Sequence, residues 1–121
     1  MEVSEKLIER INNTIRDVHD FPKKGIVFKD ITPILKDANL SKTIINQLVA
    51  NLPDQVTHVA GIESRGFLFG FPCAVAKNIS FVLIRKKGKL PYKTVSYKYD
   101  LEYGSAEIEM HTDAVGPDDK V

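Results

Sequence analysis

A short polar loop bounded by glycine is the segment best suited to chemistry. Glu63-Ser64-Arg65-Gly66 follows a β-branched run, Val56–Ile62, that predicts a buried strand, and it precedes residues with helical spacing. Backbone N–H groups at a helix start carry partial positive charge, and glycines let a phosphate come close. Arg65 adds a planar guanidinium that can hold two phosphate oxygens. The loop predicts an anion site, although a plain strand-to-helix turn with a solvated arginine fits the spacing equally well.

A second group of charges follows the next predicted strand, Ile79–Ile84. Arg85-Lys86-Lys87-Gly88-Lys89 places four cations in five residues. Taken alone, such a run is more often a solvated loop than a binding site. Parallel strands end at one edge of a sheet, however, and ligands of open parallel sheets bind at that edge. The two loops together favour a ligand that carries several phosphate charges.

Two further segments are weaker candidates. Glu102-Tyr103, at a predicted hairpin tip, could supply a proton-transfer group and a covering ring, but exposed tips often carry such residues without a function. The stretch Asp20–Asp30 offers an aromatic and apolar patch beside backbone donors and acceptors, as a flat base needs, although Phe28 could equally be a core residue. The three histidines lack the spacing of metal ligands, so no metal site built from protein side chains is expected.

Several elements must position these residues. Apolar residues at spacings of three and four predict a helix of about four turns from Val3 to Val18 and another over Ser41–Leu52, capped by Ser41. A short strand is predicted at Ile26–Phe28. Strand, helix and strand between Val56 and Ile84 predict a βαβ unit with a parallel sheet, in which the helix either kinks at Pro72 or begins near Gly70. Alternation predicts a hairpin from Thr94–Tyr99 and Ala106–Met110, with its tip at 102–105.

Composition restricts the class of protein. A chain of 121 residues suits one domain, and a net charge of +1 gives no overall field that would attract nucleic acid or an acidic membrane. The start of the chain lacks the layout of a signal peptide, and the longest apolar stretch, Gly66–Ala76, is too short to span a membrane. The one cysteine, Cys73, lies in that stretch and is expected to be buried and reduced. We therefore expect a cytoplasmic protein.

In order and separation, four segments resemble the adenine phosphoribosyltransferase family: Phe21–Pro33, Gly61–Phe67, Arg85–Pro91 and Leu101–Gly104. The resemblance implies an α/β fold with a parallel-sheet core of the phosphoribosyltransferase type, an N-terminal helical hood and a β-hairpin lid. It also implies a homodimer that transfers phosphoribosyl from phosphoribosyl pyrophosphate (PRPP) to adenine, giving AMP and pyrophosphate. Mg²⁺ would be bound through PRPP rather than by a protein cage.

The resemblance also assigns roles to residues. It places Glu102 at the adenine ring as the acid/base residue, with Tyr103 closing over the site as part of the lid. It implies a cis peptide between Glu63 and Ser64. The residues implied to contact a substrate are Val27, Phe28 and the backbone of Lys29 for adenine, and Glu63, Ser64, Arg65, Gly66 and Lys89 for pyrophosphate.

The chain is expected to be a single, incomplete domain over residues 1–121. Residues 1–35 would be the base-binding segment, and residues 54–121 a partial core with its lid hairpin at about 92–110. Family members continue beyond the position of Val121 into a loop that grips the ribose 5-phosphate, so the C-terminal part of the core would be missing and residues 1–121 alone would be inactive. Two alternatives stay open: a regulator of the same fold that binds purine nucleotides without turnover, and an inactive fragment.

Overall fold

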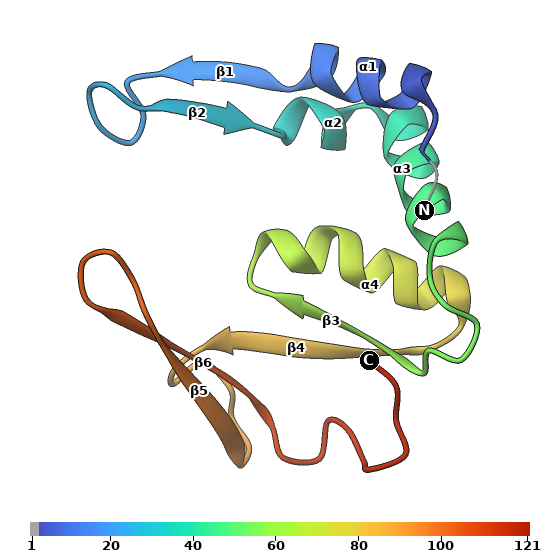
Figure 1. Cartoon of the computed structure of the whole chain (residues 1–121), viewed down its shortest axis with the longest axis vertical. Coiled ribbons are helices and arrows are strands. Elements are labelled where there is room, and N and C mark those ends of the chain that lie inside the picture. Colours follow the sequence, from blue (N-terminus) through green and yellow to red (C-terminus); the bar gives the residue numbers. More distant parts are fainter. Residues whose placement is uncertain (1–2) are drawn as a thin grey trace. The chain divides into compact units, whose positions relative to one another are not determined.

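The computed structural model describes residues 3–121, which belong to two compact units, Met1–Asn51 and Leu52–Val121. Unit 1 contains three helices and a two-stranded antiparallel sheet (Figure 1). Val18 of the first strand pairs with Phe28 of the second. Its elements are α1 (Glu5–Thr14), β1 (Arg16–His19), β2 (Val27–Asp30), α2 (Thr32–Lys36) and α3 (Ala38–Ala50).

The first helix is shorter than its apolar spacing predicts. It begins after Ser4, whose side chain accepts a hydrogen bond from Leu7 N, and it ends at Thr14. Ile15 is extended, and Val18 lies in β1 instead of in the helix. The prediction was wrong there because the backbone of residues 16–19 forms its hydrogen bonds with β2 instead of within a helix. The spacing of apolar residues does not reveal this alternative.

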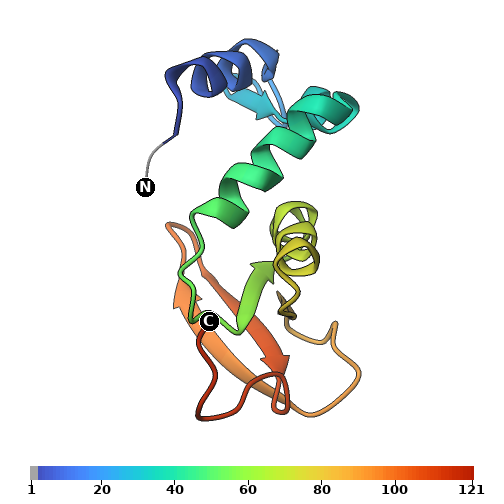
Figure 2. The same cartoon turned by 90° about the vertical axis from the view of Figure 1, so that its right-hand side faces the viewer.

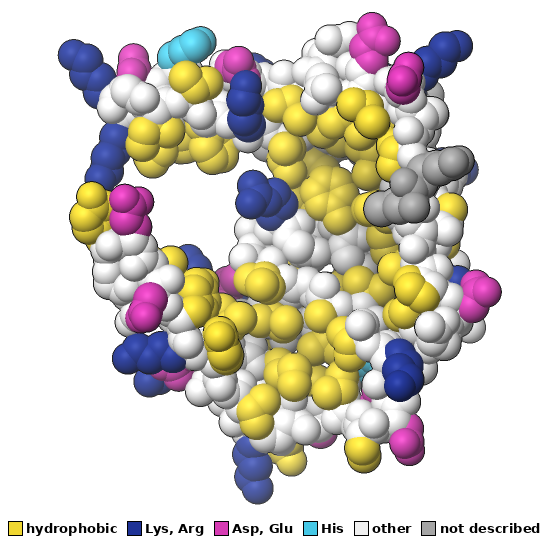
Figure 3. Space-filling model, viewed as in Figure 1, with side chains coloured by type: hydrophobic (Ala, Val, Ile, Leu, Met, Phe, Trp, Pro, Cys, Tyr) yellow, Lys and Arg dark blue, Asp and Glu magenta, His cyan; other side chains and the backbone are white. Residues whose placement is uncertain are grey.

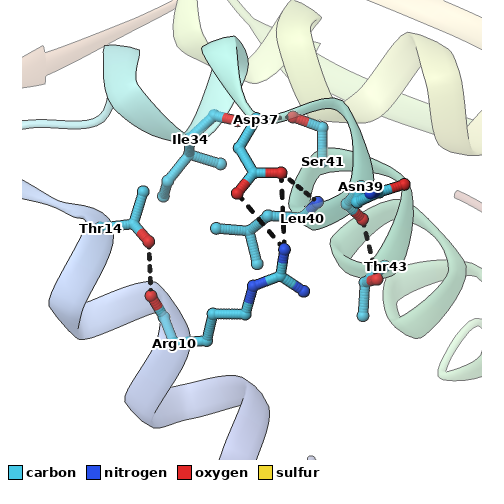
Figure 4. A network of polar contacts seen from close by, with 8 residues as sticks. All are labelled: Arg10, Thr14, Ile34, Asp37, Asn39, Leu40, Ser41 and Thr43. Carbon is cyan, nitrogen blue, oxygen red and sulfur yellow. Dashed lines mark hydrogen bonds and ion pairs between the residues drawn. The ribbon is translucent and has the colours of Figure 1, made fainter.

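The third helix begins three residues earlier than predicted, at Ala38. Asp37 is its N-cap, and its carboxylate accepts from Leu40 N at 3.0 Å and from Arg10 Nη2 of α1 at 3.3 Å (Figure 4). Ser41 is therefore not the cap; its hydroxyl donates to Ile34 O at 2.7 Å. The intervening α2 was not predicted. These contacts surround the core of unit 1, formed by Leu7, Ile34 and Leu40.

Unit 2 contains the predicted βαβ unit and hairpin. Its elements are β3 (His58–Ile62), α4 (Arg65–Lys77), β4 (Ser80–Lys86), β5 (Thr94–Asp100) and β6 (Ser105–His111). The sheet order is β3-β4-β6-β5, with β3 and β4 parallel and the other pairs antiparallel. Helix α4 lies alongside β3 (Figure 2). The α/β fold with a parallel strand pair is thus confirmed.

Helix α4 is continuous from Arg65 through Pro72, so the alternative start near Gly70 was wrong. Two glycines permit its close approach to the sheet. A Cβ on Gly70 would lie 2.6 Å from the Phe81 ring, and one on Gly61 would lie 2.7 Å from the same ring. Cys73 is buried as predicted, and desolvation raises the pKa of its thiol. Within residues 3–121, no helix has the length and apolarity that crossing a membrane requires.

Candidate functional site

The loop between β3 and α4 is tight because two glycines meet. A Cβ on Gly61 would lie 2.7 Å from Gly66 O, and one on Gly66 would lie 3.2 Å from the backbone of Gly61. The Glu63–Ser64 peptide is cis, as the family resemblance implies. Arg65 is the first residue of α4, so the backbone N–H groups of a helix start lie directly beside it. The structure therefore places Ser64, Arg65 and Gly66 at a helix N-terminus that follows a parallel strand.

The carboxylate of Glu63 is occupied by the end of β4. One oxygen accepts from Lys86 N at 2.6 Å, and the other lies 3.2 Å from Arg85 Nη2. The Lys86 N–H, followed by the Arg85 guanidinium, holds the pKa of Glu63 below its usual value. The side chain is only 15% exposed. In this arrangement the Glu63 carboxylate joins the two loops, and contact with an anion would fall to the backbone.

The register of the parallel strands places both loops at one edge of the sheet, as predicted. Ile62, the last residue of β3, pairs with Ile84, and Glu63 N donates to Ile84 O at 2.9 Å. The side chains of Arg65 and Lys89 make no hydrogen bond or ion pair within residues 3–121. Two cations are thus available at the carboxyl end of the parallel strands.

The predicted lid is a paired hairpin with an exposed tip. Strands β5 and β6 pair from Thr94↔His111 to Asp100↔Ser105. The turn closes with Leu101 N donating to Gly104 O at 2.8 Å, and Tyr103 is 89% exposed. The Glu102 side chain is exposed and has no hydrogen-bond or ion-pair partner among the described residues. The structure therefore places both residues at the tip, away from any group that would fix their side chains.

Unit 1 carries the segment predicted to hold a base. The rings of Phe21 and Phe28 meet edge to face, with centroids 5.2 Å apart. Together with Val18 and Asp30 they line an open pocket of about 260 Å³. Phe28 is 40% exposed, so it is not the core residue of the alternative interpretation. Strand β2 pairs only with β1, which leaves its other edge without a strand partner in this sheet.

The charged residues beside that pocket are paired. Lys29 Nζ lies 2.6 Å from Asp17, and Arg16 Nη2 lies 2.7 Å from Asp30. The Thr32 N–H and then the Arg16 side chain lower the pKa of Asp30 to about 2. The Lys29 ammonium is thus engaged in an ion pair, so the predicted contact with a base would fall to the backbone of this residue on β2. Sequence reasoning had not assigned Phe21 or Asp30 a role, although Phe21 belongs to the aromatic patch that it singled out.

A direct protein ligand set for a metal is not found in the described part of the chain: residues 3–121 contain no cluster of three or more His, Cys, Asp or Glu side chains suited to hold an ion. The side chains left available at the sheet edge are cationic. Such groups suit the oxygens of a phosphorylated ligand and not a bare cation.

The comparisons with known proteins agree on one family. No protein-family model matches the chain. An adenine phosphoribosyltransferase of Cytophaga hutchinsonii is 53% identical over 119 residues, which are 97% of this chain and 66% of that protein. One of Anaeromyxobacter dehalogenans is 48% identical over 116 residues, 95% of this chain and 67% of the relative. The chain thus spans about two thirds of the length of the curated relatives that it matches.

Solved structures give the same result. The crystal structure of adenine phosphoribosyltransferase from Rhodothermus marinus matches with a TM-score of 0.87 and 46% identity, over 96% of this chain and 66% of that one. The enzyme from Saccharomyces cerevisiae, complexed with an imino-altritol bisphosphate and adenine, matches with a TM-score of 0.81 and 30% identity, over 93% and 66% of the two chains.

Proposed function

The chain belongs to the adenine phosphoribosyltransferase family, and we propose that the complete protein transfers phosphoribosyl from PRPP to adenine in purine salvage. In this reaction the bond from ribose C1′ to pyrophosphate breaks, a bond from C1′ to adenine N9 forms, and the N9 proton leaves. The observation that carries the proposal is a pair of cations, Arg65 and Lys89, whose side chains have no partner within residues 3–121 and which lie in two loops at the carboxyl end of parallel strands. A ligand with several phosphate charges fits that edge.

Unit 2 would hold the pyrophosphate end of PRPP. The Arg65 guanidinium can donate to two oxygens at once, and the backbone N–H groups at the start of α4 add partial positive charge. Lys89 would contribute a point charge from the basic loop. Mg²⁺ bound to the phosphates of PRPP would neutralise part of their charge and favour departure of pyrophosphate. The protein side chains would then contact the anionic oxygens and not the metal.

Unit 1 would hold adenine. The rings of Phe21 and Phe28 offer an aromatic pocket for a flat base, and the free edge of β2 near Val27 and Lys29 offers backbone donors and acceptors. Adenine carries a 6-amino donor, whereas hypoxanthine carries a 6-oxo acceptor. An edge arranged for one pattern rejects the other, because a mismatched buried polar group costs about 1–3 kcal/mol.

The hairpin tip would complete the site. In this proposal Glu102 exchanges a proton with the adenine ring, and Tyr103 closes over the substrates and excludes water. Support comes from the resemblance of Leu101–Gly104 to the family and from the exposure of both side chains at the tip. Neither side chain has a structural partner among the described residues that would account for its presence.

We also propose that the protein works in the cytoplasm as a homodimer. Helix α4 presents exposed apolar side chains, with Leu68, Phe71 and Val75 between 45% and 61% exposed. Three such residues on one helix are typical of an interface with another protein surface. The free thiol of Cys73 suits a reducing compartment.

The test is a competition assay on the complete protein. Adenine and hypoxanthine are supplied at equal concentration with PRPP and Mg²⁺, and AMP and IMP are quantified. We expect AMP to exceed IMP by about fivefold to 150-fold, the range that corresponds to about 1–3 kcal/mol. Equal yields would overturn the base assignment, and the absence of both products would overturn the proposed function.

A further inference from the structure

Glu109 is a carboxylate of unit 2 to which the proposed reaction assigns no role. It lies on β6, and its two oxygens have different partners. Oε1 accepts from Gly88 N at 2.7 Å, and Oε2 accepts from Thr94 Oγ1 at 2.8 Å. Gly88 belongs to the basic loop that follows β4, and Thr94 is the first residue of β5. One side chain therefore joins the basic loop to the base of the hairpin.

The backbone of the basic loop has its donors occupied. Lys86 N donates to the Glu63 carboxylate at 2.6 Å, Lys87 N to Glu107 O at 3.1 Å and Gly88 N to Glu109. Lys89 N donates to Lys86 O at 3.2 Å. Four successive N–H groups are therefore unavailable to a phosphate. Any contact of this loop with an anion must come from side chains, whose positions depend on the loop conformation.

The conformation of the loop at Gly88 depends on the hydrogen bond from Gly88 N to Glu109. The φ of Gly88 is +84°, in the left-handed region that glycine adopts readily and also leaves readily. No other side chain in the described residues holds its N–H. The Gly88 N–H, followed by the Thr94 hydroxyl, keeps the pKa of Glu109 below its usual value, so the carboxylate stays ionised and accepts both bonds at neutral pH.

We propose that Glu109 is a positioning residue that fixes the turn at Gly88 and thereby places the Lys89 ammonium for the pyrophosphate end of PRPP. This inference rests on the proposed function. Glu109 touches no substrate in this account. It acts through the basic loop, and its loss weakens PRPP binding more than adenine binding.

The chain offers a matched control in Glu107. It lies two residues earlier on β6 and so faces the same side of the sheet. Its carboxylate makes only an ion pair with Lys87 Nζ at 3.7 Å, and Lys87 is 70% exposed. Such surface pairs contribute little. Glu107→Ala removes the same charge from the same strand, but it leaves the Gly88 N–H bonded.

The experiment compares variants of the complete protein. Glu109→Ala is expected to raise KM for PRPP about tenfold, as loss of a charge-assisted hydrogen bond predicts, with KM for adenine changed less than about twofold. Glu107→Ala should match the parent protein. Glu109→Gln keeps an oxygen for Gly88 N and offers an amide N–H to Thr94 Oγ1, so it should restore most of the affinity.

A second measurement separates this inference from the proposed function. Hydrogen exchange of the Gly88 amide, followed by NMR, should be slow in the parent protein and at least about tenfold faster in Glu109→Ala. If the parent protein makes no AMP, calorimetric titration with PRPP replaces KM. The inference is overturned if PRPP affinity and Gly88 exchange are unchanged in Glu109→Ala, or if Glu107→Ala has the same effect.

Discussion

The basic loop of unit 2 is proposed to bind pyrophosphate, and the hairpin tip is proposed to transfer a proton. The two regions differ in how many of their polar groups are already hydrogen-bonded. In the loop, Glu63 and Glu109 each accept a backbone N–H, and Arg85 pairs with Glu63. At the tip, Glu102 and Tyr103 have no such partner in the described residues. The difference suits their proposed roles, since a loop that binds a charged ground state benefits from a fixed backbone. A proton-transfer residue needs its carboxylate unoccupied.

Unit 2 also has exposed apolar surface. Apolar side chains gather over the sheet of unit 2 on the face seen in Figure 3. On β5, Val95 is 49% exposed and Tyr97 is 68% exposed. Strand β5 is therefore held by its pairing with β6 more than by burial, since six of its seven residues are exposed. The strand pairing ends at Asp100↔Ser105, next to the tip.

The largest expected effect tests the role of the tip. Glu102→Gln should lower kcat by about 10²–10⁴ and spare KM for adenine, because it removes proton transfer without removing a ground-state contact. Steady-state kinetics with both substrates measures this. Asp100→Asn, an exposed carboxylate at the end of β5, is the control and should retain the parent kcat. A raised KM with unchanged kcat would instead make Glu102 a binding residue.

A smaller effect is expected at the helix start. Arg65→Ala should weaken PRPP binding by about ten- to a hundredfold, which corresponds to loss of a charge-assisted contact. Folding should be retained, since Arg65 makes no side-chain hydrogen bond or ion pair within residues 3–121. Isothermal titration with PRPP measures the affinity, and circular dichroism the fold. Lys77→Ala at the other end of α4 is the control. An unchanged PRPP affinity in Arg65→Ala would mean that the guanidinium is a solvated surface charge with no role in binding.

The smallest effect is a pH dependence of the hydrogen bonds that hold the basic loop. The pKa of Glu63 in the folded protein lies below the usual 4.5 because of the Lys86 N–H. Its hydrogen bond is therefore fully present above that value and is lost as the pH falls through the lowered pKa. NMR shifts of the Lys86 and Gly88 amides should titrate in that acidic range. Lys86 and Gly88 amide shifts that stay constant through that range would contradict these contacts.

A further acid-sensitive contact lies in unit 1. The pKa of Asp30 is about 2, against an ordinary value of 3.8, so its hydrogen bonds to Thr32 and Arg16 stabilise the fold above 3.8 and are lost as the pH falls through about 2. Asp30→Asn should lower the melting temperature at neutral pH by on the order of a few degrees. At pH 2 the difference from the parent protein should shrink. Asp17→Asn, in a more exposed pair with Lys29, is the control and should have a smaller effect.

The sequence predicted elements where one periodicity dominates. Alternation along β5 and β6 and the β-branched runs of β3 and β4 gave the hairpin and the parallel pair. Prediction from the sequence was wrong where the same residues fit two alternative local structures. Val18 fits the apolar face of α1, yet it pairs with Phe28. Ser41 is a good capping residue by type, but Asp37 takes the position because its carboxylate also reaches Arg10.

In the candidate site, too, some features were predictable from the sequence and others were not. Glycine, arginine and lysine in loops after predicted strands were enough to indicate an anion site. The partners of Glu63 and Glu109 were not predictable, because they depend on the register of β4 against β3 and β6. No local pattern distinguishes Glu109 from Glu107, two residues away on the same strand. Only the position of the Gly88 N–H separates their roles.

The most direct test of the account is a crystal structure of the complete protein with pyrophosphate bound. We predict pyrophosphate at the start of α4, in contact with the Arg65 guanidinium and the Lys89 ammonium. The bonds from Lys86 N to Glu63 and from Gly88 N to Glu109 should be retained. Pyrophosphate bound away from both cations, or held by the backbone N–H groups of residues 86–89 after those carboxylates have turned away, would contradict it.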